Sequence, residues 1–189
     1  MIDVHTHILP GMDDGSKSVT ESIEMLKELK RQGVNEVVLS SHYYAEKETP
    51  ESFFARREKA YSELKAAIEN EEDMPKLRLG AEICYYVGVS ILENKRKFCI
   101  EGTSLFLLEL PLWRKLDRGI IEEVKRLSMK QEVIVLLAHV DRYIDFNSAS
   151  IFEELAEAGV LIQLNTGFIE KHNKRIIKKI NKKGWPHFL

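Results

Sequence analysis

The side chains in this sequence that are best suited to chemistry are histidines and carboxylates at the ends of short apolar segments. The set comprises His5, His7, His42, Glu82, Glu109 and His139. Imidazole and carboxylate groups are the ligands that zinc, manganese and iron take in proteins. The residue types therefore indicate a metal site assembled from distant parts of the chain.

The spacing of these residues supports the same interpretation. The chain opens with Asp-Val-His-Thr-His, and side chains two residues apart in an extended segment point to the same side, so His5 and His7 can bind one ion. Glu82 could bridge two ions through its two oxygens, and two metals about 3.5–4 Å apart are a common arrangement for phosphoester hydrolysis. Glu109 lies within the apolar segment 105–110, where a carboxylate is costly to bury unless it is paired or bound to metal.

Simpler interpretations exist for individual residues. His42 could be a capping or loop histidine, and His139 could be a hydrogen-bonded histidine of the core. Asp13 and Asp14 could supply another carboxylate ligand, or they could form an Asp-Gly turn that leads into a helix. Only the joint pattern favours a metal site over these alternatives.

Arg142 follows the candidate ligand His139 by three residues. A guanidinium group donates two parallel hydrogen bonds and therefore suits a phosphoryl group. The alternative is a surface ion pair with Asp141 or Asp145. Of the remaining histidines, we expect His172 to lie on the surface and His187 to be structural.

Apolar segments alternate with longer amphipathic segments, which is typical of repeated βα units around a mainly parallel sheet. We expect strands at 1–4, 36–40, 77–81, 105–110, 133–138 and 160–165, and a seventh beginning at 187. We expect helices beginning at Ser18 and ending near Gly33, then at 51–70, 118–130, 148–158 and 175–183. Strands such as 133–138 are apolar throughout, as strands covered on both faces are. An open doubly wound sheet and a barrel both fit, but polar residues at successive strand ends favour a barrel, whose active site lies at that rim.

Length and composition restrict the class of protein. The 189 residues, 44% of them hydrophobic, suit a single domain, and a net charge of -2 gives no general attraction to nucleic acid. We interpret the basic stretch 171–183 as the solvated face of a helix. Two cysteines make no disulfide framework, no leader segment is visible, and the apolar runs are too short to insert into a membrane. We therefore expect a cytoplasmic protein.

Other hydrolytic mechanisms fit poorly. A cysteine-type tyrosine phosphatase requires an arginine six residues after its cysteine, but Ser90 follows Cys84 and Leu105 follows Cys99 at that spacing. The sequence also contains no P-loop, no dinucleotide-binding glycine pattern and no nucleophile elbow.

The opening residues 1–15 closely resemble the start of a PHP (polymerase and histidinol phosphatase) domain. The segments 41–43, 80–83, 108–111 and 138–143 are similar, in order and spacing, to the bacterial tyrosine phosphatases of capsule and exopolysaccharide loci, the CpsB/YwqE-like group. This resemblance extends over essentially the whole chain. It implies an α/β fold, a distorted TIM-like (β/α)7 PHP barrel, over residues 1–189.

The resemblance also implies a cofactor and a substrate. It implies two to three divalent ions, most often manganese, with iron or zinc as alternatives. One ion would be held by His5, His7 and Glu82, a second by Glu82, Glu109 and His139, and a third by Asp14 and His42, while Arg142 would orient the phosphate. The implied substrate is phosphotyrosine on a bacterial tyrosine kinase that regulates polysaccharide export, with no role for nucleic acid.

One departure from the family pattern affects these expectations. The family continues with an Asp-x-His segment that completes two metal sites, whereas this sequence stops at Leu189. We therefore expect a single PHP domain that lacks its C-terminal end and has an open barrel edge, which would favour a homo-oligomer. Three functions stay open: a phosphotyrosine-protein phosphatase, a histidinol-phosphate or other small phosphoester phosphatase, and a catalytically weak binding module.

Overall fold

The computed structural model describes residues 1–112, 114–130, 132–165 and 167. The chain divides into two compact units: unit 1 comprises Met1–Cys84 and Ile100–Thr103, and unit 2 comprises Tyr85–Cys99 and the chain from Ser104 onward. The expectation of one domain over residues 1–189 stays a prediction.

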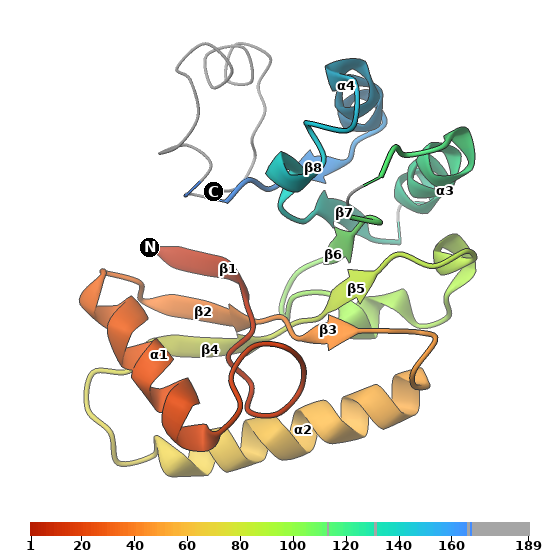
Figure 1. The fold of residues 1–189 in the computed structure, drawn as a ribbon. Helices are drawn as coiled ribbons and strands as arrows, with labels where there is room; N and C mark the ends of the chain where they lie inside the picture. The colour runs from red at the N-terminus through yellow and green to blue at the C-terminus, as the bar shows by residue number, and fades with distance from the viewer. Residues whose placement is uncertain (113, 131, 166, 168–189) are drawn as a thin grey trace. The chain divides into compact units, whose positions relative to one another are not determined.

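Unit 1 is built on parallel β-strands. Strands β1 (Ile2–Thr6), β2 (Glu36–Leu39) and β4 (Lys76–Leu79) form a sheet in the order β1-β2-β4, with each neighbouring pair parallel (Figure 1). Two shorter strands, β3 (His42–Tyr43) and β5 (Glu82–Cys84), form a second parallel pair. These short strands were not among the predicted elements.

Strands β3 and β5 continue the path of β2 and β4 after a break in each. The backbone N–H of Gly80 donates to the carbonyl of Leu39 at 3.1 Å, and that of Glu82 donates to the carbonyl of Ser40 at 3.2 Å. The pairing keeps the same offset through both breaks, from Leu39 opposite Leu79 to His42 opposite Glu82. The two breaks are therefore matched in length, and two predicted metal ligands stay in register.

The helices of unit 1 begin and end where their capping residues require. Helix α1 (Val19–Arg31) has Ser18 as its N-cap, with the side chain accepting from the N–H of Glu21, and Gly33 follows its end at a φ of +86°. Helix α2 (Pro50–Ala67) buries a face made of Phe53, Ala60 and Leu64. The two helices contact each other, and in the view of Figure 1 α2 lies below β2 and β4 whereas α1 runs downward beside them.

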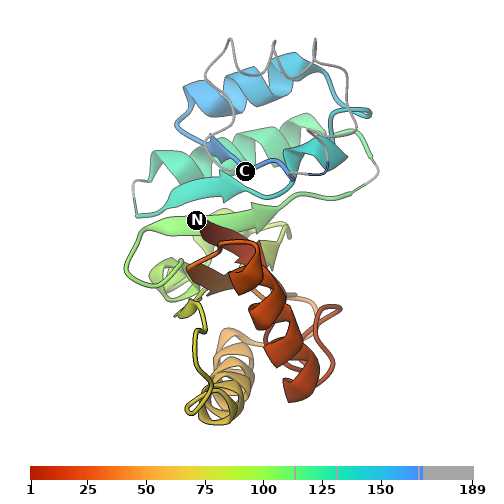
Figure 2. The same ribbon diagram turned by 90° about the vertical axis from the view of Figure 1, so that its left-hand side faces the viewer.

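Unit 2 contains three neighbouring parallel strands. Strand β7 (Ile134–Leu137) pairs in parallel with β6 (Leu105–Glu109) on one side and with β8 (Leu161–Ile162) on the other. Helices α3 (Arg118–Met129) and α4 (Ala149–Glu157) lie side by side against these strands (Figure 2). Three short 3-10 helices complete the unit: η1 (Val89–Ile91), η2 (Lys95–Phe98) and η3 (Val140–Arg142).

The α/β class with parallel strands is confirmed, and four of the five predicted helices are present within a few residues of the expected bounds. The predicted strand 160–165 is shorter than expected, because β8 covers only Leu161–Ile162. The predicted helix at 175–183 and the strand at 187 lie outside the described residues, and closure into a barrel stays a prediction. None of the helices in the described part of the chain combines the length and apolar composition needed to span a bilayer.

Candidate metal site

Three imidazoles of unit 1 converge on a single carboxylate oxygen. Glu82 Oε2 lies 3.1 Å from Nε2 of His5, 3.1 Å from Nε2 of His7 and 3.2 Å from Nδ1 of His42. The side chain of Glu82 is only 1% exposed, and those of His5 and His42 are 9% exposed. We call this group, His5, His7, His42 and Glu82, the histidine cluster.

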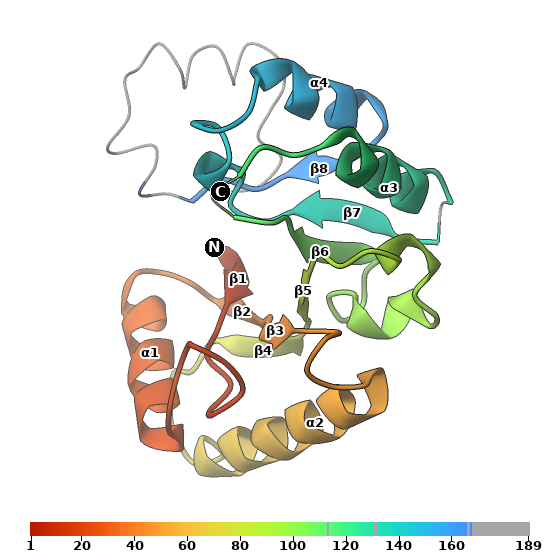
Figure 3. The same cartoon turned by 45° about the vertical axis from the view of Figure 1, so that its right-hand side comes forward.

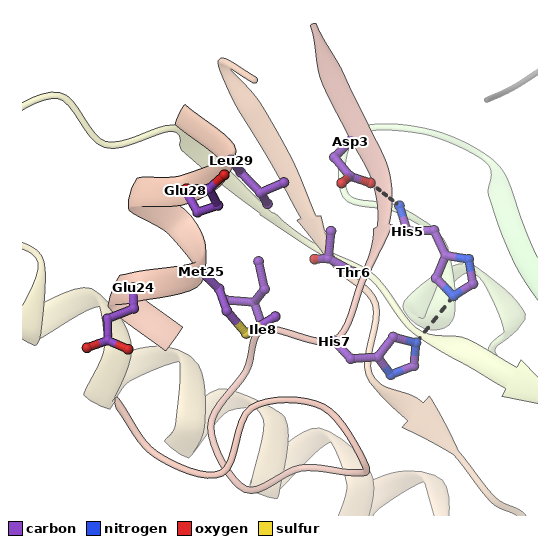
Figure 4. Close-up of a pocket in the computed structure, with 9 residues that line it drawn as sticks. All are labelled: Asp3, His5, Thr6, His7, Ile8, Glu24, Met25, Glu28 and Leu29. Atoms are coloured by element: carbon purple, nitrogen blue, oxygen red, sulfur yellow. Dashed lines mark hydrogen bonds between the residues drawn. The ribbon is translucent and has the colours of Figure 1, made fainter. Parts of the chain in front are cut away.

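The strands of unit 1 explain how the cluster forms. His5 lies in β1 and His7 follows its end, so the two rings project to the same side and their Nε2 atoms lie 3.3 Å apart (Figure 4). The parallel register of β3 and β5 brings His42 opposite Glu82. Asp3 supports the arrangement by accepting a hydrogen bond from the backbone N–H of His5 at 3.1 Å.

The two adjacent aspartates after β1 have different surroundings. The Asp13 side chain is 1% exposed, whereas that of Asp14 is 81% exposed. Asp13 Oδ2 lies 2.8 Å from His7 Nδ1 and accepts the backbone N–H of His42 at 2.8 Å, while Oδ1 accepts the N–H of Gly15 at 2.9 Å. Asp14 Oδ1 lies 3.8 Å from both His7 Nδ1 and His42 Nε2. Asp13 therefore orients His7, and Asp14 is left at the solvent side of the cluster.

The electrostatics of the cluster call for positive charge. Burial alone would lower the pKa of His7, but the carboxylates of Asp13 and Glu82 outweigh it and raise that pKa to about 10. Burial would likewise raise the pKa of Asp13, but the bonds from His7 and from two backbone N–H groups lower it to about 2. Imidazole nitrogens this close to one another and to a buried carboxylate favour positive charge among them. Protonation of His7 supplies it in the metal-free protein, and a divalent metal ion also fits this donor set.

Unit 2 carries a separate pair of candidate ligands. His139 Nε2 lies 3.2 Å from Glu109 Oε1, and both side chains are largely buried. The backbone of His139 has a φ of +34°, a conformation that non-glycine residues rarely adopt, and its N–H donates to Gln163 Oε1 at 2.5 Å. The hydroxyl of Tyr143 lies 3.4 Å from His139 Nδ1 and donates to the carbonyl of Leu110 at 3.1 Å. The strained backbone and these bonds fix the orientation of the ring.

Arg142 lies in η3 and is exposed. Asp141 instead accepts hydrogen bonds from the backbone and side-chain amides of Asn165, at 2.8 and 3.2 Å. Within the described part of the chain, Arg142 forms no ion pair.

A cavity of about 510 Å³ lies beside the histidine cluster, between β1 with its following loop and α1 (Figure 4). It is lined by Asp3, His5, Thr6, His7, Ile8, Glu24, Met25, Glu28 and Leu29. In Figure 4 the rings of His5 and His7 point away from α1, toward the histidine cluster, so the cavity borders the cluster at the backbone of β1 and its following loop.

The structure brings together His5, His7, His42 and Glu82, places Asp14 beside them, and pairs Glu109 with His139 in unit 2. One contact was missed by the sequence interpretation: Cys84 Sγ lies 3.2 Å from His42 Nδ1. The sequence gives no signal for this contact, because the proximity of His42 in β3 to Cys84 in β5 depends on strand register. His172, His187 and the basic stretch 171–183 lie outside the described residues.

Comparison with known proteins identifies the family of this chain. The family model described as "Capsular polysaccharide synthesis, CpsB/CapC" matches residues 1–188. The tyrosine-protein phosphatase CpsB of Streptococcus pneumoniae is 29% identical over 177 residues, which span 90% of this chain and 70% of the relative. The tyrosine-protein phosphatase YwqE of Bacillus subtilis is 32% identical over 172 residues, spanning 88% of this chain and 65% of the relative.

Solved structures give the same result. A structure from work on YwqE of Bacillus subtilis and CpsB of Streptococcus pneumoniae, described as unique metal-dependent tyrosine phosphatases, superposes with a TM-score of 0.79 at 25% identity, covering 96% of this chain and 74% of that one. The protein hisK of Listeria monocytogenes, described as a candidate histidinol phosphatase, has a TM-score of 0.55 at 14% identity over 100% of this chain and 93% of its own. The second likeness shows the fold alone. The family match, which extends over nearly the whole sequence, shows that this chain belongs to the CpsB/CapC family of capsular polysaccharide synthesis proteins.

Proposed function

We propose that this chain is a metal-dependent phosphatase that hydrolyses phosphotyrosine in proteins. The observation that carries the proposal is the histidine cluster, in which three imidazoles surround one buried carboxylate oxygen at 3.1–3.2 Å. The relatives named tyrosine-protein phosphatases and the family match over residues 1–188 support this reaction in particular.

His5, His7, His42 and Glu82 would hold the metal, with Asp14 adding a carboxylate from the solvent side. Bound divalent ions supply Lewis acidity toward water and toward the phosphoryl oxygens. Asp13 keeps Nδ1 of His7 occupied, so Nε2 of that ring is directed into the cluster. The chain thus presents a rigid set of ligands, and little of it has to reorganise when an ion binds.

We also assign roles to the residues of unit 2. Glu109 and His139 are ligands of the same chemical types, and we propose that they are required for the same activity. Arg142 would donate two parallel hydrogen bonds to the phosphoryl group, because its guanidinium group is exposed and forms no ion pair within the described residues. Tyrosinate, with a pKa of about 10, leaves without strong help from a general acid.

The finer proposals follow from the family. We propose two to three bound ions, with manganese as the first candidate and iron or zinc as alternatives. We propose that the substrate is a phosphorylated bacterial tyrosine kinase that acts in polysaccharide synthesis. Self-association of the chain is a further proposal.

The test is phosphate release from a phosphotyrosine peptide, with histidinol phosphate as the competing substrate, in manganese and in chelator. We expect chelator-sensitive release from the peptide, and its loss in Glu82→Gln and in Glu109→Gln. Glu63→Gln on the exposed face of α2 is the matched control and should retain full activity. Release from histidinol phosphate alone would assign the protein to small phosphoesters, and unchanged turnover in Glu82→Gln would refute the site.

A further inference from the structure

The chain from Tyr85 to Ile91, which we call the 85–91 loop, exposes two large apolar side chains. Val87 is 88% exposed and Ile91 is 70% exposed, although both are large apolar side chains. A Cβ placed on Gly88, the residue after Val87, would lie 3.9 Å from the Ile91 side chain, so the two apolar residues flank the same turn. Apolar side chains that are exposed together mark binding surfaces.

The loop is held rigidly by one carboxylate of α3. Glu123 accepts hydrogen bonds from the Tyr85 hydroxyl at 2.7 Å, from the backbone N–H of Gly88 at 2.8 Å and from the Ser90 hydroxyl at 3.2 Å. Gly88 has a φ of +102°, which favours glycine, and the ammonium group of Lys130 donates to the carbonyl of Ser90 at 3.2 Å. Figure 3 shows this segment beside α3. An apolar surface that is held in one conformation loses little entropy when a ligand binds.

The loop adjoins Glu109, a proposed metal ligand of the same unit. Its first residue, Tyr85, donates its backbone N–H to the carbonyl of Glu109 at 2.8 Å.

The charge of the surrounding segment suits a phosphorylated peptide. Residues 85–99 contain three basic residues against one acidic residue, and Arg96 and Lys97 are exposed. Lys95 is buried, and its ammonium group forms an ion pair with Glu132. Exposed positive charge beside an apolar surface favours a negatively charged peptide that also carries an apolar side chain.

Resting on the proposed function, we propose that the 85–91 loop binds the substrate peptide beside the phosphotyrosine, with an apolar side chain seated on Val87 and Ile91. Glu123 is the positioning residue of this surface. The loop would thereby give the phosphatase a preference for phosphotyrosine that has an apolar neighbour.

The test compares three substrates: a phosphotyrosine peptide with leucine on each side of the phosphotyrosine, the same peptide with serine there, and p-nitrophenyl phosphate. In the double variant Val87→Ser/Ile91→Ser, kcat/KM for the leucine peptide should fall about 10-fold, through KM, since burying about 55 Å² of apolar surface contributes roughly that factor. Turnover of p-nitrophenyl phosphate should be unchanged. Met129→Ser is the matched control, because Met129 is 71% exposed in the same unit but lies in α3.

The role of Glu123 has its own readout. Glu123→Ala should raise KM for the leucine peptide and speed amide exchange at Gly88 and Ser90, whereas Glu123→Gln, which keeps an acceptor oxygen, should restore most of both. An equal loss on p-nitrophenyl phosphate, an equal effect of Met129→Ser, or an unchanged KM in the loop variant would overturn the proposal. If the wild-type chain hydrolyses none of the substrates, the proposed function fails instead, and the loop is then judged by phosphopeptide binding, where an unchanged Kd in the double variant overturns it.

Discussion

Asp13 offers the sharpest test of how the histidine cluster is built. Its carboxylate contacts Nδ1 of His7 and accepts the backbone N–H groups of His42 and Gly15, and its side chain is 1% exposed. It therefore ties together three segments that carry or border proposed ligands. The perturbation is the pair of variants Asp13→Ala and Asp13→Asn.

The magnitudes follow from these bonds. Removing a carboxylate that orients a metal-bound histidine commonly costs 10–100-fold in metal affinity, which is about 1.4–2.7 kcal/mol. Asp13→Ala also leaves two partly buried N–H groups without their acceptor, at about 1–2.5 kcal/mol each, because full burial would cost about 1–3 kcal/mol. We expect manganese affinity to fall 10–100-fold in both variants, and the free energy of unfolding of the metal-free protein to fall by about 2–5 kcal/mol in Asp13→Ala. Asp13→Asn, which keeps one acceptor oxygen, should unfold less easily than Asp13→Ala.

Isothermal titration with manganese measures the affinity, and urea denaturation in chelator measures the stability. Asp14→Asn is the control for stability, because the Asp14 side chain is 81% exposed and a surface change of this kind should alter unfolding by no more than about 0.5 kcal/mol. Wild-type manganese affinity in both Asp13 variants would refute the orienting role. If Asp14→Asn lowered the free energy of unfolding as much as Asp13→Ala does, the burial of Asp13 would not explain the loss of stability.

Three further predictions concern single groups. A Cβ at Gly15 would overlap the carbonyl of His7. Gly15→Ala should therefore displace that ligand, weaken manganese binding and lower the free energy of unfolding by about 1–3 kcal/mol. Gly11→Ala is the control, because nothing lies near the added atom there, and it should leave manganese binding intact. Burial would raise the pKa of Glu123, but the hydrogen bonds that it accepts from Tyr85, Gly88 and Ser90 lower that pKa below 4.5. Its contribution to stability is therefore present above pH 4.5 and is lost as the pH falls. The free energy of unfolding should depend less on acid pH in Glu123→Gln, and an unchanged pH dependence would count against these bonds. Burial raises the pKa of Cys99 to about 11, so thiol labelling of the native protein at pH 8 should modify Cys84 well before Cys99, and equal rates would contradict the buried position of Cys99.

The helices were predictable because their ends carry local signals. Ser18 caps α1 and Ser148 caps α4, and Gly33 and Gly159 follow these helices at positive φ. Each signal depends on a side chain and its immediate neighbours, so sequence alone was sufficient.

Short strands and side-chain environments were not predictable in the same way. Strands β3 and β5 contain two and three residues, which is too few to show a periodicity. The sequence named His42 and Glu82 as ligands but placed them after strands, whereas they lie within β3 and β5 and face each other through strand register. Residue types and spacing could not distinguish Asp13 from Asp14, because the two share one turn and differ only in which of them the folded chain buries; the choice of Asp14 as a ligand came from the family resemblance.

The measurement that most directly tests the central claim is the metal content of the purified chain after dialysis against trace manganese, by plasma mass spectrometry. The wild-type protein and Glu63→Gln should retain at least one ion per chain. Glu82→Gln should retain far less, because three imidazoles converge on a carboxylate oxygen of Glu82 in the wild type. Equal metal content in Glu82→Gln and the wild type, or almost none in the wild type, would contradict the account of the histidine cluster as a metal site.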